Sequence, residues 1–255
     1  MFINYEKEGR IATFTLNRPE VGNAVNLQMV IELRESMLDF RDDDGLWVGI
    51  VTGSGNAFCS GADIKDFLPV LQKSRLKPWT IPDTPIRGFN LYKPLIAAIN
   101  GVAYGGGLEL ALGCDIRVAS ENARLGQLEV TVGMMPGWGG TQRLPRLIPW
   151  NMAAEMIFTG KPIDAHEAYR IGLINRVVPQ DKLMDTAKEI ATNICKVGPL
   201  AVRKAKEAML KGINMTLEYG LELEDTLVGY VTSSEDFTEG IKAYKEKRKP
   251  IFKAK

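Results

Sequence analysis

The segment that decides the fold is AINGVAYGGGLELALGCD, residues 98–115, where three glycines lead into a run of Leu and Ala that holds one carboxylate, Glu109. On an exposed helix a glutamate usually faces water beside a Lys or Arg one turn away. The residues three and four positions from Glu109 are three glycines and a leucine, which cannot neutralise its charge. A carboxyl group in apolar surroundings has a raised pKa, as general acid–base chemistry requires. Glu109 is therefore either a catalytic group or an outward-facing residue of a short amphipathic helix.

The glycine-rich segment follows a buried-strand pattern, and the same order occurs once more in the chain. A short apolar run, a glycine turn and a helix start appear in residues 49–65 and again in residues 95–111. Strands are also predicted at residues 9–19 and 115–120, and a helix is predicted from Leu27 to Phe40. This alternation continues to about residue 145 and predicts an α/β fold.

From Pro149 onward the pattern becomes helical. Helix-like segments separated by Gly, Pro or Ser occupy residues 181–196, 198–212, 215–231 and 234–249. Such helices pack either on their own core or on another subunit, and the sequence pattern is equally compatible with both arrangements. We expect a core at 1–195 and a C-terminal helical region at 196–255.

The composition is that of an ordinary globular protein. The 255 residues are 45% hydrophobic and 25% charged, and the net charge is +1. This balance gives no bias toward nucleic acid or anionic lipid. Residues 1–20 show no signal-sequence pattern, and no apolar run reaches the roughly 20 residues that span a bilayer. We expect a cytoplasmic protein with no membrane partner.

The cysteines and the histidine exclude several kinds of site. Cys59, Cys114 and Cys195 are far apart, odd in number and without a CxxC pair, which argues against a disulfide framework. His166 is the single histidine, which excludes a multi-histidine metal centre and disfavours a Ser-His-Asp triad. We expect no metal and no cofactor, and catalysis by carboxylates, backbone groups or a thiol.

Both strand–glycine–helix turns expose N–H groups that begin a helix and lack an intrahelical acceptor. Two such groups aimed at one point can hold the negative oxygen of an enolate, and we expect Ala62 and Gly106 to donate them. Two ordinary α/β turns would show the same pattern. A phosphate-binding loop is disfavoured, because there is no GK[ST] and GGGLEL lacks the last glycine of GxGxxG.

Sequence blocks along nearly the whole chain resemble the enoyl-CoA hydratase/isomerase, or crotonase, family. The blocks are AFCSGADIKDF (57–67), AAINGVAYGGGLELALGCDIRVAS (97–120), ARLGQLEVTVGMMPGWGGTQRLPR (123–146), TGKPIDAHEAYRIGLINRVV (159–178) and SSEDFTEGIKAYKEKRKPIF (233–252). The resemblance implies a spiral of repeated ββα units followed by a helical oligomerisation region. It also implies an acyl-CoA substrate and trimers that pair as hexamers.

The resemblance assigns roles to individual residues. Ala62 and Gly106 match the oxyanion-hole donors, and Glu109 and Glu129 match the acid/base pair of hydratases, although Glu129 could instead be structural beside Arg143 or Arg146. Gly137 is expected on the water side of the site, where Trp138 departs from the small residue often found. Residues 66–94 resemble the segment that covers the acyl chain. The implied contacts to substrate and CoA are Ala24, Ser60, Ala62, Asp63, Ile64, Lys65, Gly106, Gly137 and Lys247.

The predicted function is that of a lyase in fatty-acid metabolism, such as β-oxidation. It adds water reversibly to a 2-enoyl-CoA and forms a 3-hydroxyacyl-CoA. A Δ3,Δ2-enoyl-CoA isomerase needs only one base, so retention of Glu109 favours hydration. The acyl group stays open, whether linear, branched, aromatic or cyclic. A catalytically inactive nucleic-acid or protein-binding module is the alternative of another class, but the only basic helix, 202–212, has the pattern of a packed helix with a solvated face.

Overall fold

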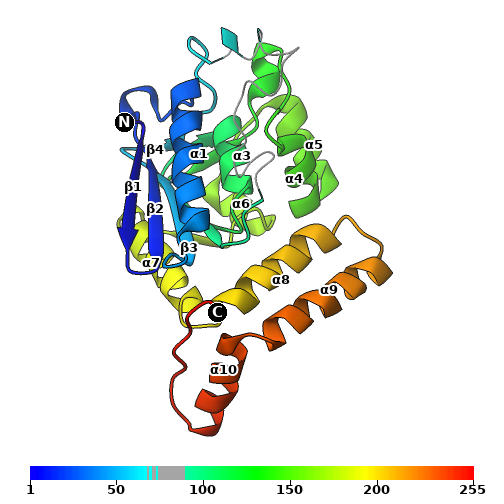
Figure 1. Cartoon of the computed structure of the whole chain (residues 1–255). Coiled ribbons are helices and arrows are strands. Elements are labelled where there is room, and N and C mark those ends of the chain that lie inside the picture. The colour runs from blue at the N-terminus through cyan, green and yellow to red at the C-terminus, as the bar shows by residue number, and fades with distance from the viewer. Residues whose placement is uncertain (68, 71–72, 74–89) are drawn as a thin grey trace.

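Two β-sheets and the helices around them form the fold in the computed structural model, which describes residues 1–67, 69–70, 73 and 90–255 (Figure 1). The larger sheet has the order β1-β2-β3-β5-β7-β10, and the smaller sheet has the order β4-β6-β8-β9. The strands of the larger sheet are β1 (Ile3–Glu8), β2 (Ile11–Leu16), β3 (Val48–Gly53), β5 (Leu95–Ile99), β7 (Ile116–Ser120) and β10 (Arg176–Val178). Those of the smaller sheet are β4 (Ala57–Cys59), β6 (Val102–Tyr104), β8 (Arg124–Gly126) and β9 (Ile163–Asp164).

The helices lie around and beyond these sheets. The α-helices are α1 (Leu27–Asp42), α3 (Gly106–Leu112), α4 (Gly140–Leu147), α5 (Trp150–Thr159), α6 (Ala165–Arg170), α7 (Leu183–Ile194), α8 (Pro199–Gly212), α9 (Leu217–Thr232) and α10 (Glu235–Lys245). Short 3₁₀ helices are η1 (Pro19–Val21), η3 (Glu129–Val132) and η4 (Gln180–Lys182).

The chain forms a spiral because consecutive strands from β3 to β8 alternate between the two sheets. β3, β5 and β7 lie parallel in the larger sheet, with Ile50 opposite Ile96 and Ala97 opposite Arg117. β4, β6 and β8 lie parallel in the smaller sheet. Each turn of the spiral thus adds one strand to each sheet, and α3 completes the turn that begins with β5. This arrangement confirms the predicted α/β fold with its ββα repeat.

The burial of the strands follows from their composition. All residues of β3 and β5 are buried, because helices or the second sheet cover both faces of the larger sheet. Ile50 and Ile96 face α7, whereas Val51 and Ala97 face the main core. α1 belongs to that core through Met29, Leu33, Met37 and Phe40, which share one helix face. The sequence pattern from Leu27 to Phe40 is therefore confirmed as a helix.

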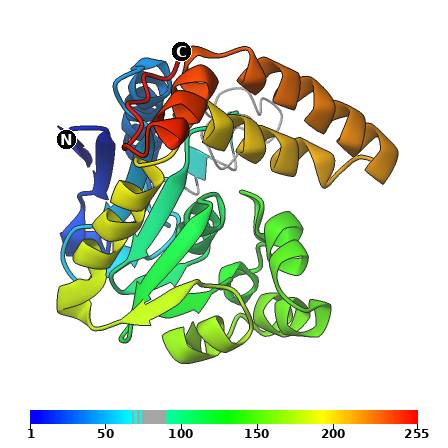
Figure 2. The ribbon, with the colours of Figure 1, turned by 90° about the horizontal axis from the view of Figure 1, so that it is seen from below.

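The helices after α7 extend away from the sheets. In Figure 1, α8 and α9 form an antiparallel pair below the body, and Figure 2 shows the same pair from below. Lys206 on α8 donates to the Asp115 carboxylate at 2.6 Å and to the Lys93 carbonyl at 3.0 Å. These contacts connect the α8–α9 pair to the core. The predicted division at residue 195 stays a prediction, although strands end with β10 in the described part of the chain.

The structure also differs from the sequence-based expectations. β1 was not predicted, because only Ile3 of its residues is buried and the rest reads as a polar segment. The helix expected directly after Gly61 is preceded by a turn at residues 64–67, and residues 69, 70 and 73 are helical, so the Ala62 N–H does not begin a helix as expected. Most of residues 66–94, the segment expected to cover the acyl chain, lies outside the described residues. None of the helices that the structure describes combines the length and apolar character needed to cross a membrane.

Candidate active site

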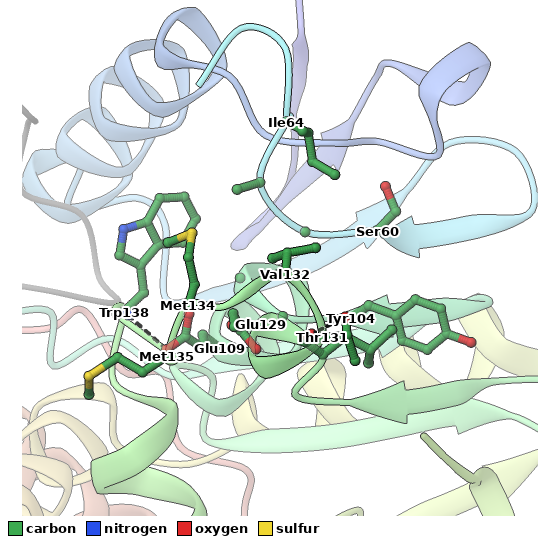
Figure 3. Close-up of a pocket in the computed structure, with 16 residues that line it drawn as sticks. Ser60, Ile64, Tyr104, Glu109, Glu129, Thr131, Val132, Met134, Met135 and Trp138 are labelled. Atoms are coloured by element: carbon green, nitrogen blue, oxygen red, sulfur yellow. Dashed lines mark hydrogen bonds between the residues drawn. The ribbon is translucent and has the colours of Figure 1, made fainter. Parts of the chain in front are cut away.

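A pocket of about 250 Å³ opens between the loop after β4, the start of α3 and the segment that follows β8 (Figure 3). Both glutamates selected from the sequence line it, as do both expected backbone donors. The lining residues are Ser60, Gly61, Ala62, Ile64, Tyr104, Gly105, Gly106, Glu109, Leu128, Glu129, Thr131, Val132, Met134, Met135, Gly137 and Trp138. The structure therefore brings Ala62, Gly106, Glu109 and Glu129 to one cavity from three separate stretches of sequence.

The glycines that begin α3 are required by close neighbours. Gly105 has φ +51°, and a Cβ there would lie 3.2 Å from the Glu129 carboxylate. A Cβ on Gly106 would lie 2.9 Å from the Trp138 ring, and one on Gly107 would clash with the backbone oxygen of Cys59. These glycines thus let the helix start lie directly against the pocket and against β4.

The geometry of two neighbouring segments places the Ala62 and Gly106 backbones on the same wall. Val25 donates to the Gly61 carbonyl and accepts from the Asp63 amide, both at 2.8 Å, so the Ala62 N–H faces away from Val25. Gly106 is the first residue of α3, so its N–H has no intrahelical acceptor. A Cβ added to Gly61 would lie 3.9 Å from the Gly106 nitrogen, which shows how closely the two segments approach.

Glu109 is buried, with 2% of its surface exposed, and one of its oxygens is fixed by backbone donors. The amides of Trp138 and Gly140 both donate to Oε1, each at 2.7 Å. Burial raises the pKa of Glu109, while these hydrogen bonds and the positive charge of Arg143 oppose the rise. The carboxylate is thus held in one orientation inside the protein, which excludes the outward-facing alternative.

Glu129 lies at the first position of η3, with its carboxylate against Gly105. Burial, together with the negative charge of Glu109, raises the pKa of Glu129 to about 7. Arg143 donates to the Trp138 carbonyl and Arg146 donates to Gln142, so these contacts do not involve Glu129. The charge of ionised Glu109 therefore helps to keep the Glu129 carboxyl group protonated.

Gln127 is a buried residue of this site that was not predicted from the sequence. When its amide nitrogen faces Glu129, it donates to both carboxylate oxygens, at 3.2 and 3.3 Å. The signal available in the sequence was its place in GQLE, directly after β8 and two residues before Glu129. The apolar lining by Leu128, Val132 and the methionines was also missed.

The Trp138 indole forms part of the pocket wall over Gly106. Its ring also contacts the Phe67 ring, with centroids 5.4 Å apart, and Figure 3 shows it beside Met134. Position 138 therefore holds a large aromatic surface next to the fixed carboxylate of Glu109. This wall narrows the space around the site on one side.

The expected CoA contacts divide into residues at the pocket and residues away from it. Ser60, Ile64 and Gly137 line the pocket together with Ala62 and Gly106. Ala24 and Asp63 do not line it, because Arg18 binds the Ala24 carbonyl and the Asp63 carboxylate. Lys65 and Lys247 are exposed outside the pocket, and Lys247 follows α10 with φ +53°. Among the described residues, no His, Cys, Asp and Glu side chains group as a metal site would require.

Comparisons with known proteins extend over the whole chain. A family model described as enoyl-CoA hydratase/isomerase matches residues 6–255. The sequence is 43% identical to a short-chain-enoyl-CoA hydratase of Clostridium acetobutylicum, over 96% of this chain and 94% of that protein. It is 40% identical to a crotonyl-CoA hydratase of Syntrophomonas wolfei, over 98% of this chain and 97% of that protein. A crystal structure of an enoyl-CoA hydratase from Bacillus anthracis matches with a TM-score of 0.93, 39% identity and 100% coverage of both chains.

Proposed function

Because the chain belongs to the enoyl-CoA hydratase/isomerase family, we propose that it is an enoyl-CoA hydratase that adds water reversibly to a 2-enoyl-CoA. The observation that carries this proposal is the meeting of Glu109 and Glu129 in one pocket with the Ala62 and Gly106 backbones. The two relatives described above are named as hydratases of short-chain enoyl-CoA and of crotonyl-CoA. The hydration product is a 3-hydroxyacyl-CoA.

The oxyanion hole is part of the proposal. The thioester oxygen accepts hydrogen bonds from the Ala62 and Gly106 amides, which withdraw electrons from the conjugated C=C bond and stabilise the enolate. Losing one such donor typically raises the barrier by about 2.7 to 4 kcal/mol. The glycines around Gly106 support this role, because they let a ligand approach the backbone closely.

The two carboxylates divide the proton transfers. Glu109 takes a proton from water as the water oxygen bonds to the β carbon, and protonated Glu129 delivers a proton to the α carbon. After one turnover Glu109 holds a proton and Glu129 is ionised, so proton exchange within the pair or with solvent restores the starting state. The raised pKa of Glu129, about 7, supports its assignment as the acid.

An isomerase that moves a double bond from the 3,4 to the 2,3 position is the second candidate within the same family. One base suffices for it, because the same proton leaves one carbon and returns to another. The two backbone donors that orient Glu109 favour hydration, since a second fixed carboxylate is what the addition of water requires.

The direct test is hydration of crotonyl-CoA by the purified protein without added metal or nicotinamide. Hydration removes the conjugation of the thioester, so the absorbance of the 2-enoyl group decreases. Linear, branched, aromatic and cyclic enoyl-CoAs tested in parallel identify the acyl group. No turnover with any of them, combined with conversion of a 3-enoyl-CoA to a 2-enoyl-CoA, would favour the isomerase.

The remaining assignments belong to the same proposal. CoA is bound as part of the substrate, with Ala24, Asp63, Lys65 and Lys247 near it and no separate cofactor. The assembly is a trimer or hexamer built on the C-terminal helices. A cytoplasmic location is consistent with the free thiols of Cys59, Cys114 and Cys195, and a role in fatty-acid degradation follows from the proposed substrate. An inactive nucleic-acid-binding module predicts retention of labelled RNA on filters at physiological salt without affinity for CoA.

A further inference from the structure

Arg18 is a buried charged residue outside the pocket, located shortly after β2. Its Nη1 donates to the Ala24 carbonyl at 2.6 Å and to Oδ2 of Asp63 at 3.0 Å. Its own N–H donates to Oδ1 of Asn23 at 2.8 Å. The guanidinium therefore joins the 23–25 segment to the loop after β4, and Arg18 and Asp63 are 45 residues apart in sequence.

These two segments determine where the Ala62 N–H lies. Asp63 follows Ala62 directly, and its other carboxylate oxygen, Oδ1, accepts from the amides of Lys65 at 3.0 Å and Asp66 at 3.1 Å. On the other side, Val25 follows Ala24 directly and bonds the residues on both sides of Ala62. The Arg18 guanidinium thus binds Asp63 directly. It is connected to Gly61 indirectly, through Ala24 and the adjacent Val25.

Stability alone is a weak reason to keep this buried ion pair. Replacing a buried pair by apolar residues of similar volume is often neutral or stabilising. In addition, the Arg18 Nε atom is buried without a hydrogen-bond partner among the described residues, which costs free energy. A displacement of about 1 Å in a catalytic group can lower the rate about 10²-fold, so a rigid support for Ala62 has a functional value.

We propose that Arg18 is a positioning residue that, through Ala24 and Asp63, fixes the Ala62 amide in the oxyanion hole. The proposal deepens the proposed function and rests on it, because the Ala62 N–H matters only if a thioester oxygen binds there. Arg18 does not touch the acyl group, since it is not among the residues that line the pocket. Its loss weakens carbonyl polarisation without removing substrate affinity.

The test compares Arg18→Met with Arg18→Lys and uses Arg170→Met as the matched control. Met keeps an unbranched apolar side chain without donors, whereas Lys keeps the charge but cannot reproduce the planar guanidinium. Arg170 forms an exposed ion pair with Glu167, so the control removes an arginine away from the pocket. For Arg18→Met we expect kcat to fall about 10- to 10²-fold with KM within about twofold, on the scale of a misplaced group. Arg18→Lys should recover part of kcat, and Arg170→Met should match the unchanged protein.

A spectroscopic measurement separates positioning from a general loss of stability. A cinnamoyl-CoA with a para-dimethylamino group absorbs at longer wavelength when hydrogen bonds polarise its carbonyl. Arg18→Met should bind this probe with nearly unchanged affinity and show a smaller red shift. An unchanged red shift, or a loss confined to KM, overturns the proposal. Because the unchanged protein is assayed alongside, its failure to hydrate any enoyl-CoA would reject the proposed function rather than the role of Arg18.

Asp63→Asn provides the second variant if Arg18→Met does not fold. An asparagine oxygen can still accept from the Lys65 and Asp66 amides, while the charge that pairs with Arg18 is removed. The red shift should also be smaller in Asp63→Asn than in the unchanged protein. The decrease should be less than that expected for Arg18→Met, which removes the whole guanidinium. A full red shift in folded Asp63→Asn would contradict the proposed connection.

Discussion

At the scale of single residues, Glu109 is held by its surroundings in a way that suits one reaction role. Two backbone amides bind Oε1, which holds the carboxylate in one orientation at the pocket. Glu129 has no such pair of backbone donors among the described contacts and faces Gln127 and Gly105 instead. Two carboxylates with the same chemistry thus differ because their neighbours differ.

Glu109→Gln and Glu129→Gln should each lower hydration by roughly 10² to 10⁴, the range for losing a general acid/base group. A glutamine oxygen can still accept from the Trp138 and Gly140 amides, so acyl-CoA affinity should change little. Steady-state kinetics and binding of a product analogue measure the two effects separately. If the glutamates act as one unit, the double variant should be scarcely slower than the slower single variant. Near-normal hydration by Glu109→Gln would contradict its catalytic role.

The pKa of about 7 at Glu129 predicts the same pH dependence of kcat/KM in both directions, because hydration neither releases nor takes up a proton overall. Hydration needs the protonated acid, so kcat/KM for hydration should fall as pH rises through about 7. Dehydration of the 3-hydroxyacyl-CoA needs the same single proton on Glu109 instead, so its kcat/KM should fall over the same interval. Initial rates in both directions, from about pH 5.5 to about pH 8.5, cover the titration on both sides of that pKa. Residual hydration by Glu129→Gln should lack this titration, and a kcat/KM for hydration that does not fall over this interval would count against the assignment.

The same group should contribute to stability in a direction fixed by its shifted pKa. The folded protein keeps the Glu129 proton up to about 7, whereas the ordinary glutamate pKa is 4.5. The contribution of Glu129 to stability is thus fully present below pH 4.5. The free energy of unfolding falls as the pH rises from there to about 7. Glu129→Gln should be more stable than the unchanged protein by about 1 kcal/mol above pH ~7, a discounted value because solvent reaches part of the side chain. Urea unfolding at several pH values tests this, and an equal stability across that range would contradict it.

At the scale of elements, the start of α3 joins catalysis to packing. Gly107→Ala places a methyl group against the backbone oxygen of Cys59 in β4, and a backbone atom cannot move as a side chain can. We expect a loss of about 1 to 3 kcal/mol in unfolding free energy, typical of overpacking, together with lower kcat because Ala62 follows β4. Gly229→Ala is the control, since nothing lies within 4 Å of its added Cβ. Thermal unfolding compares the two, and equal stabilities would show that α3 and β4 can separate freely.

The elements that were predicted correctly from the sequence are those with a strong local pattern. β3 and β5 are continuous apolar runs, and α1 repeats apolar residues at helical spacing. β4, β6 and β8 have three residues each, which is too short for any period to show. They were nevertheless the strands that brought Ala62, Gly106 and Glu129 together. The turns selected Ala62 and Gly106, although only Gly106 begins a helix, and the family resemblance matched both and added Glu129.

Parts of the site had no local signal at all. Arg18 contacts Ala24 and Asp63, and nothing in the sequence places Asp63, 45 residues away, beside it. The lining from Leu128 to Met135 belongs to a 3₁₀ helix and loop without periodicity. Acyl-chain selection is likewise unreadable from the sequence, because it depends on the shape of such a wall.

At the scale of the whole molecule, α8 and α9 present more apolar surface than a solvated helix pair usually does. Met209 is 75% exposed, Leu217 is 80% exposed, and both line a groove between the two helices. Large contiguous apolar patches on soluble proteins commonly mark interfaces. A second copy of this chain is the partner that the predicted trimer would supply.

Leu217→Glu should therefore shift the protein from an assembly of three or six 28.2 kDa chains toward the monomer. A carboxylate in an apolar interface loses its hydration without a partner, which opposes association. Light scattering across a concentration series measures the mass, and Leu217→Met, which keeps the side chain apolar, serves as the control. Activity should fall together with the mass if the neighbouring chain completes the CoA site through Lys247. A stable, fully active monomer of the unchanged protein would mean that these helices serve their own chain, and the contact from a neighbour would be rejected with the interface.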